Sequence, residues 1–282
     1  MSSLSQQLFH PNLLLAVLLS ALFAFGAFKF KLVTLSGAIA TFLVGFIVYG
    51  LGGGLFTIPL FTFFISSSLL SRFRSVSKAK SAVKAAKGAT RDAWQVIANG
   101  GVAALIVVAF YFMKNHFPTP VVRNLLCLYL AALATSNADT WATEIGGFSK
   151  SLPRLLKNWK VAETGTSGAI SGLGLLASIA GSFVIPLSVF WVWKLFQDEL
   201  FVVVWAGFLG AFADSILGAS VQAVYKDPKT GQLTELREIE GRKTDKVSGV
   251  SWINNDVVNL MASVIGVLFA WLMLKYGVTP YR

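Results

Sequence analysis

Acidic, amide and hydroxyl side chains form three short clusters in the second half of the chain, at Asn137–Glu144, Asp214–Ser215 and Asn254–Asn259. In the first cluster Thr140 and Glu144 lie one helical turn apart, and Asp139 borders the face that they share. Carboxylate and amide oxygens are hard ligands, which suit Mg²⁺ better than softer metals. The residue types in these clusters therefore favour a magnesium site.

The third cluster places its polar side chains on one face of an expected helix. Asn259 lies four residues after Asn255 and three after Asp256, so these side chains can converge. Ionisable residues within or beside membrane spans are energetically expensive, and each is a functional candidate for that reason. The plainer alternative is that a carboxylate caps a helix or pairs with a loop lysine. For any single residue the two interpretations weigh equally, and only the clustering favours a site.

Two further segments contain residue types that bind phosphate. The run Gly-Thr-Ser-Gly at 165–168 is expected to open a helix, where small residues expose backbone N–H groups to an anion. Arg91, Gln95 and Asn99 recur at four-residue spacing, so a polar stripe would run about two turns into the bilayer. Each segment also has a structural alternative, because small residues serve helix packing and polar stripes can be packed inside a bundle. The sequence contains neither a Walker A pattern nor a kinase glycine-rich loop with its partners.

Membrane-spanning helices must position these clusters. The 282 residues are 55% hydrophobic and 13% charged, whereas a soluble domain carries about a quarter charged residues. The apolar residues form blocks of roughly 20 residues, the length that crosses a bilayer core. The sequence predicts a single integral membrane domain over 1–282, an all-α bundle of about eight spans (seven to nine). The spans are expected at 12–28, 33–50, 53–70, 93–113, 119–136, 166–193, 200–222 and 250–274.

The loops between these spans differ in charge. Of the 24 Lys and Arg residues, 19 fall on one set of alternate loops and 5 on the other. By the positive-inside rule the first set is cytoplasmic, which places both termini outside and the polar clusters at the cytoplasmic face of a bacterial inner or an organellar membrane. The same rule explains the net charge of +11 without nucleic acid as a partner. The only cysteine, Cys127, excludes disulfides, and two histidines argue against a zinc site.

Residues 71–92 form the most basic of these loops. Small and apolar residues recur in it at helical spacing, and Lys80, Lys84, Lys87 and Arg91 form a separate stripe. The pattern predicts a cytoplasmic amphipathic helix that lies on anionic lipid headgroups. The alternative is a lid that supplies cations to a bound phosphate.

A short internal repeat spans 133–275. The stretches LATSNADTWATEIG at 133–146 and LGAFADSILGAS at 209–220 both place Ala-Asp-Ser/Thr near the cytoplasmic end of an inward-running helix. Each is followed by a basic loop and by a helix that is expected to begin with small or polar residues. Two parallel helical hairpins would build a pseudo-symmetric catalytic region, although the match is short and coincidence is the alternative.

Taken together, these motifs resemble a known family. They are ADTWATEIG at 138–146, GTSG at 165–168, ADS at 213–215, NDVVN at 255–259, and RDAWQ followed by ANG between 91 and 100. The set is similar to the signature of the phytyl-phosphate kinases of the vitamin E pathway, within a multi-span membrane family related to phytol and dolichol kinases. The resemblance covers about residues 34–275.

The resemblance implies transfer of the γ-phosphoryl group of a nucleoside triphosphate, CTP or another, to an isoprenoid monophosphate embedded among membrane lipids. It implies that Asp139, Glu144, Asp214 and Asp256 hold Mg²⁺, and that Arg91 neutralises developing charge. The implied nucleotide- and phosphate-binding residues are Gly165, Thr166, Ser167, Lys160, Lys87, Asn255, Asn259, Gln95 and Asn99.

Two other functions remain open from the sequence. A kinase for the free isoprenoid alcohol would need a base, and Asp139 or Asp214 could serve. A transporter would also contain repeats and intramembrane acids. The polar residues gather at the expected cytoplasmic ends of the spans instead of the bilayer midplane, which favours an enzyme. The sequence does not determine the oligomeric state.

Overall fold

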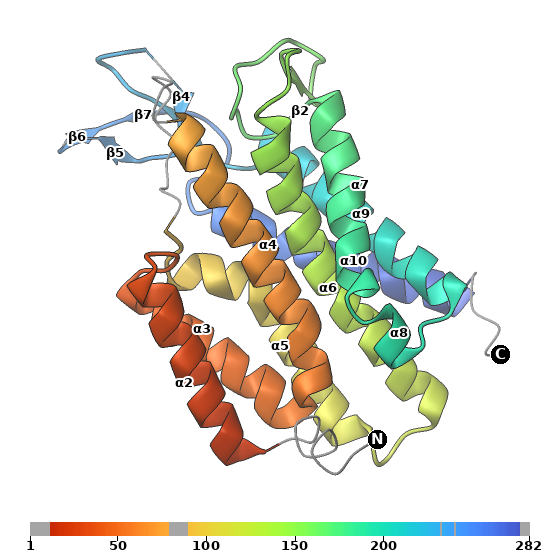
Figure 1. Cartoon of the computed structure of the whole chain (residues 1–282). Helices are drawn as coiled ribbons and strands as arrows, with labels where there is room; N and C mark the ends of the chain where they lie inside the picture. Colours follow the sequence, from red (N-terminus) through yellow and green to blue (C-terminus); the bar gives the residue numbers. More distant parts are fainter. Residues whose placement is uncertain (1–11, 79–89, 232, 240, 277–282) are drawn as a thin grey trace.

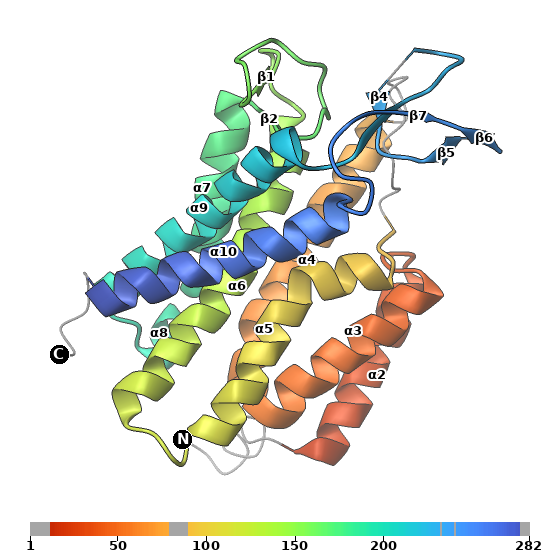
Figure 2. The same ribbon diagram turned by 180° about the vertical axis from the view of Figure 1, so that it is seen from behind.

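The computed structural model describes residues 12–78, 90–231, 233–239 and 241–276. Within these residues eight principal helices run side by side and form the bundle seen in Figures 1 and 2. They are α2 (Leu13–Lys29), α3 (Leu35–Ile47), α4 (Gly54–Lys78), α5 (Ala93–Met113), α6 (Thr119–Gly146), α7 (Gly172–Leu187), α9 (Gln197–Ser220) and α10 (Asn255–Tyr276). By length and composition, six helical segments of this part of the chain can cross a membrane, and α2 and α7 are shorter apolar helices. The predicted polytopic helical bundle is confirmed.

The turn between α3 and α4 shows how glycine sets a helix boundary. The chain leaves α3 through a π-helical turn, η1 (Val48–Gly52), and Gly53 then adopts a φ of +79°. Because L side chains rarely tolerate that φ, Gly53 ends the helix and lets α4 begin at the next residue. The glycine-rich run at 50–54 thus continues α3 before it reverses the chain.

Helix α6 is the centre of the bundle. It packs against α4, α5, α7, α9 and α10, and its residues from Tyr129 to Ala138 are all buried. Glycines allow this close approach: a Cβ on Gly207 would stand 2.7 Å from Cβ of Ala134, and a Cβ on Gly266 would stand 2.1 Å from Oγ1 of Thr135. Small residues at such contacts let helix backbones pack tightly inside a membrane.

Short strands occupy the end of the bundle at which α4, α6 and α9 terminate and α7 and α10 begin (Figure 1). Strands β1 (Arg154–Leu155) and β2 (Ala169–Ile170) pair antiparallel. Strand β3 (Val224–Lys226) lies between β4 (Leu233–Thr234) and β7 (Asp245–Ser248), and β5 (Glu238–Ile239) pairs with β6 (Arg242–Lys243). The purely helical prediction missed these strands, which satisfy backbone hydrogen bonds in the long loops outside the spans.

Two predicted helix starts and the predicted helix at 71–92 differ from the structure, and α4 and α6 extend beyond the predicted spans 53–70 and 119–136. Helix α7 begins at Gly172, not at 166, because Gly165 and Gly168 have φ values of +94° and +73° that a helix does not accommodate. Helix α10 begins at Asn255, not at 250, and Oδ1 of Asn254 accepts a hydrogen bond from the Val257 N–H at 3.0 Å. Within 71–92, residues 71–78 continue α4 and residues 90–92 are not helical, whereas 79–89, which include Lys87, lie outside the described residues.

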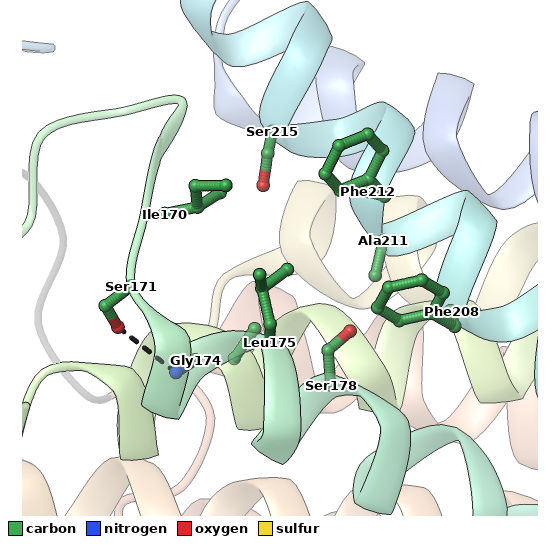
Figure 3. A pocket seen from close by; sticks show the side chains of 10 residues that line it. Ile170, Ser171, Gly174, Leu175, Ser178, Phe208, Ala211, Phe212 and Ser215 are labelled. Atoms are coloured by element: carbon green, nitrogen blue, oxygen red, sulfur yellow. Dashed lines mark hydrogen bonds between the residues drawn. The ribbon is translucent and has the colours of Figure 1, made fainter. Parts of the chain in front are cut away.

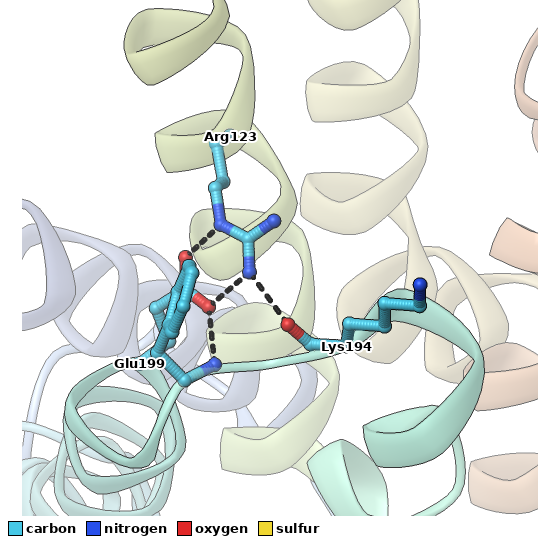
Figure 4. A network of polar contacts seen from close by, with 4 residues as sticks. Arg123, Lys194 and Glu199 are labelled. Carbon is cyan, nitrogen blue, oxygen red and sulfur yellow. Dashed lines mark hydrogen bonds and ion pairs between the residues drawn. The ribbon is translucent and has the colours of Figure 1, made fainter.

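The opposite end of the bundle contains a half-buried ion pair (Figure 4). Arg123 near the start of α6 binds both carboxylate oxygens of Glu199 in the first turn of α9, and its Nη2 also donates to the Lys194 carbonyl at 2.9 Å. Oε2 of Glu199 accepts a hydrogen bond from the Phe196 N–H at 2.8 Å. A short helix, α8 (Phe190–Trp193), links α7 to this corner. These contacts hold α6 against α9 at the end of the bundle opposite to the acidic clusters.

Candidate functional site

Acidic residues of α6 and α9 share one polar region near the end of the bundle that holds the strands. Asp139 lies two turns before the end of α6, and Asp214 lies at a similar depth in α9. The charge of Asp139 interacts with those of Glu144 and Asp214, so the first and second sequence clusters lie near each other. Both aspartates are half-buried, which leaves part of each side chain accessible.

Helix α10 joins the same region through an amide. The Nδ2 of Asn259, in the orientation that satisfies both neighbours, donates to Oδ2 of Asp214 at 3.0 Å and to the Asn255 carbonyl at 3.1 Å. The side chains of Asn255, Asp256 and Asn259 were predicted to converge; the structure instead shows Asn259 bonded to the main chain of Asn255 and bridging α10 to α9 through Asp214. Asp256 is buried in the first turn of α10, where the helix dipole favours a negative charge.

A basic residue approaches the region from the segment that enters α5. The guanidinium of Arg91 lies 5.7 Å from the ring centroids of both Phe63 and Phe64 on α4, and its charge interacts with Glu144. Oε1 of Glu144 in turn accepts a hydrogen bond from Oγ of Ser71 on α4 at 2.9 Å. Burial lowers the pKa of Arg91 to about 10, while the charge of Glu144 acts in the opposite direction. Arg91 is therefore a cation at neutral pH.

The four predicted metal ligands do not form one cluster. Among the described residues, no group of three or more His, Cys, Asp and Glu side chains is arranged to hold a metal ion. The donor set nevertheless fits one mode of Mg²⁺ binding, in which one or two carboxylates and the oxygens of substrate phosphates complete the shell with water. Asp139 and Asp214, which come from facing helices, are the pair whose chemistry suits that mode.

The Gly-Thr-Ser-Gly run lies in a loop against the end of α9 and does not open a helix. A Cβ on Gly168 would stand 2.2 Å from the main-chain nitrogen of Ala219, so only glycine allows this contact. Oγ of Ser167 donates to Oε1 of Gln222 at 2.8 Å, and Nε2 of Gln222 donates to Oε1 of Glu235 at 2.7 Å. The run predicted to bind phosphate is thus seated beside the acidic region, although by different local geometry.

Other predicted phosphate-binding residues lie elsewhere or serve local structure. Gln95 forms a capping box with Asp92 at the start of α5, and Nδ2 of Asn99 donates to the Gln95 carbonyl at 2.8 Å. Lys160 is exposed in the loop between α6 and α7, and its N–H donates to the Asn158 side chain. Gly165 is exposed and Thr166 is half-buried in the same loop. The structure does not bring Lys160 into contact with the carboxylates.

Buried polar residues of the first cluster hold helices together. Oδ1 of Asn137 accepts from Ser66 at 2.9 Å, and its Nδ2 donates to the Gly181 carbonyl at 2.7 Å, so this residue links α6 to α4 and α7. Ser136 donates to the Asn99 carbonyl and contacts Ser263 on α10 at 3.2 Å. These amide and hydroxyl groups support the site from within the bundle.

A small cavity borders the acidic region between α6, α7 and α9 (Figure 3). Side chains of Leu175, Phe208 and Phe212 line it, with the hydroxyls of Ser178 and Ser215 facing the space. Ser215 follows Asp214 directly in α9. The cavity is therefore mainly apolar and reaches α9 at the residue that follows Asp214.

Comparison with known proteins decides the family. Residues 18–267 match the family described as integral membrane protein DUF92. The chain belongs to this family. The family relationship expected from the motifs is confirmed, and the DUF92 match covers all eight helices at least in part.

Similar proteins occur in plants and archaea. The chain is 30% identical to Protein PGR of Arabidopsis thaliana over 276 residues, and the aligned region covers 90% of this chain and 93% of that protein. It is 26% identical to the chloroplastic protein VTE6 of the same plant over 265 residues, and the aligned region covers 94% of this chain and 70% of VTE6. An uncharacterized membrane protein of Methanocaldococcus jannaschii is 29% identical over 257 residues, covering 90% and 91%. No solved structure matches.

Sequence reasoning missed several residues of this candidate site. Ser71 and Gln222 contact the predicted Glu144 and Ser167, and Glu235 contacts Gln222, but none of the three belongs to a predicted cluster. Ser71 lies in a serine-containing stretch at the loop-bearing end of α4, and Gln222 is an amide in an otherwise small and apolar stretch from Leu217 to Val224. A polar residue in such a stretch was the available signal for Gln222. The sequence contained no such signal for Glu235, because its contact with Gln222 joins residues that are 13 positions apart across a loop.

Proposed function

We propose that this protein is a membrane-embedded kinase that transfers the γ-phosphoryl group of a nucleoside triphosphate to an isoprenoid monophosphate, phytyl phosphate or a similar one. The observation that carries the proposal is the approach of Asp139, Asp214 and Asn259 from three helices, beside Arg91 and Glu144. The motif resemblance to phytyl-phosphate kinases and the similarity to VTE6 support the choice of reaction.

The chemistry needs positioning and charge stabilisation more than a base. An oxygen of the acceptor phosphate forms a bond to the γ-phosphorus, the bond from that phosphorus to the β–γ bridging oxygen breaks, and the nucleoside diphosphate leaves with the electron pair. The acceptor oxygen is already anionic, so no hydroxyl must be deprotonated. Mg²⁺, when bound, would supply charge neutralisation of the triphosphate.

Each group of the site has a role in this proposal. Asp139 and Asp214 would hold Mg²⁺, with Asn259 orienting the carboxylate of Asp214 through its hydrogen bond. Arg91 would face the phosphates as a fixed cation, held over the Phe63 and Phe64 rings. The loop at 165–168 would approach the nucleotide through Thr166 and Ser167. The isoprenoid chain would lie among the apolar helices, with its first atoms near the cavity beside Ser215.

A labelled-nucleotide assay tests the proposal. Purified protein in detergent is incubated with Mg²⁺, a γ-labelled nucleoside triphosphate and either phytyl monophosphate or phytol. We expect label in the isoprenoid diphosphate, and about 10²–10³-fold less of it with Asp139→Asn or Asp214→Asn, as for loss of a group that stabilises transition-state charge. Asp245→Asn on the exposed strand β7 is the matched control and should retain the wild-type rate.

The outcomes separate the alternatives. If label appears only in phytyl monophosphate made from phytol, the acceptor is the free alcohol and not the proposed isoprenoid monophosphate. No transfer to either acceptor with any nucleotide, or wild-type rates in both aspartate variants, would overturn the proposal. Retained thermal unfolding midpoints in the two variants are required, because a misfolded protein would also be inactive.

A further inference from the structure

Gln222 occupies a junction of three segments that are distant in sequence. It lies two residues beyond the end of α9 and is 2% exposed. One side-chain atom accepts from Ser167 in the loop before α7, and the other donates to Glu235 beside β4. Its carbonyl is covered by Gly249, where a Cβ would stand 1.9 Å from the oxygen. The amide thus connects the loop between α6 and α7 to the loop between α9 and α10.

Both hydrogen bonds are well formed, and both come from a side chain enclosed by protein. The distances are 2.8 Å to Ser167 and 2.7 Å to Glu235, and the second has a carboxylate acceptor. Hydrogen bonds to charged acceptors are roughly twice as strong as neutral ones. Buried amides with both groups satisfied have little freedom to move, because any rotation would leave a polar atom without its partner. Gln222 therefore fixes the position of Ser167 relative to Glu235.

The junction reaches the turn of α9 that follows Asp214. A Cβ on Gly218, four residues after Asp214, would stand 2.7 Å from Oγ of Ser167, and the charge of Glu235 acts on the carboxylate of Asp214. Two like charges held near each other attract a cation or a cationic side chain, and their spacing sets how strongly they do so. The position of Glu235 consequently affects the electrostatics at Asp214, and the hydrogen bond from Gln222 holds one carboxylate oxygen of Glu235.

We infer that Gln222 is a positioning residue for the proposed phosphoryl transfer, which couples the loop at 165–168 to Asp214 through Glu235. The inference rests on the proposed function. It assigns to the strand-bearing loop after α9 a role in the site: Glu235 adjusts the negative charge that Mg²⁺ and the triphosphate meet. Gln222 itself is not placed in contact with substrate.

A mutant cycle measures this coupling. Ser167→Ala, Glu235→Gln and their combination are assayed for kcat/KM and for the Mg²⁺ concentration at half-maximal rate, first with Gln222 and then in a Gln222→Met background. Residues in one hydrogen-bond network show non-additive effects, and we expect about tenfold non-additivity in kcat/KM with Gln222 present. In the Gln222→Met background, which lacks the amide, the same two changes should combine additively. Glu235→Gln should also raise the half-maximal Mg²⁺ concentration several-fold.

Two further variants serve as a control and as a test of the geometry. Glu238→Gln, an exposed change on β5 of the same loop, should leave both kcat/KM and the half-maximal Mg²⁺ concentration unchanged. Gln222→Glu tests the geometry with a nearly isosteric side chain that places a second negative charge against Glu235, and it should lower kcat/KM at least as much as Gln222→Met. Additive effects in the Gln222 background, or an unaltered Mg²⁺ dependence in Glu235→Gln, would overturn the inference while the proposed function stands. An inactive wild-type protein would instead overturn the proposed function and this inference together.

Discussion

Replacing Gly168 by alanine tests whether the loop at 165–168 must be seated on α9. The added Cβ would stand 2.2 Å from the nitrogen and 2.5 Å from the Cα of Ala219. These neighbours are helix backbone, which cannot move aside as a flexible side chain would. Overpacking of this kind costs about 1–3 kcal/mol, and alanine at a φ of +73° adds about 1–2 kcal/mol. The expected loss of stability is therefore about 2–5 kcal/mol.

Two other glycines separate the cost of the steric overlap from the cost of the positive φ. Gly165 has a φ of +94° but nothing within 4 Å of a Cβ, so Gly165→Ala should lose only the backbone share, about 1–2 kcal/mol. Gly172 has an ordinary φ and equally open surroundings at the start of α7, so Gly172→Ala should be neutral or stabilising by about 0.5–1 kcal/mol. The series thus ranks Gly172→Ala, Gly165→Ala and Gly168→Ala in order of increasing damage.

Thermal unfolding in detergent and kcat/KM are measured on the three variants and the wild type. Gly168→Ala should lower both, because moving the loop away from Ala219 also breaks the Ser167–Gln222 hydrogen bond. Gly165→Ala should lower the unfolding midpoint slightly and leave that bond intact. If Gly168→Ala and Gly165→Ala proved indistinguishable in both measurements, the close contact between this loop and α9 would be refuted.

Two further predictions concern charged residues. Arg123→Met removes the partner of Glu199, whose side chain is 4% exposed, and should lower the free energy of unfolding by about 2–3 kcal/mol. This loss is smaller than that for breaking a fully buried ion pair, because the Arg123 side chain is 24% exposed. The thermal midpoint should fall while kcat/KM below that temperature is unchanged; a midpoint equal to that of Lys194→Met would contradict this. Arg91→Lys retains the cation, but a lysine ammonium loses its proton more readily than a guanidinium and burial lowers its pKa further. The pH–rate profile of this variant should therefore lose activity at a lower alkaline pH than that of the wild type, whose Arg91 has a pKa of about 10. Identical alkaline limbs would contradict the role of Arg91.

The helices could be predicted from sequence because the bilayer imposes a simple rule. Blocks of apolar residues long enough to cross it must be helical, since lipid offers no hydrogen-bond partners to the backbone. Most of the predicted spans begin close to an observed helix for that reason, without tertiary information. The exceptions are α7 and α10, where Gly168 and Gly249 have positive φ values that composition alone did not reveal. Both glycines lie against backbone atoms of the segment that ends α9, a contact that only the fold creates.

The candidate site was predictable in its location but not in its contacts. Charge patterning and motif positions placed the acids at one end of the spans, and the structure brings Asp139, Asp214 and Asn259 together there. The hydrogen bonds of Gln222 depend on loops whose course is not periodic, so no spacing rule could find them. Gln95 is different, because Asp92 with Gln three residues later is a capping-box pattern that local sequence reveals. Its role in starting α5 could have been predicted.

The packing below the acids bears on the choice between an enzyme and a transporter. Thr135 lies one helical turn before Asp139 in α6. A Cβ on Gly210 would stand 2.4 Å from its Oγ1, and a Cβ on Gly266 would stand 2.1 Å from it. The helices α6, α9 and α10 therefore pack so closely there that no added methyl group would fit. A transported solute needs a path through the bundle that both sides can reach in turn, and transporters build their sites at such a midpoint. Here the polar residues lie above a closed contact of three helices, on the side of the long loops. A substrate whose phosphate stays at the surface and whose chain stays in lipid needs no passage through that contact, so the closed contact is compatible with the proposed phosphotransfer reaction.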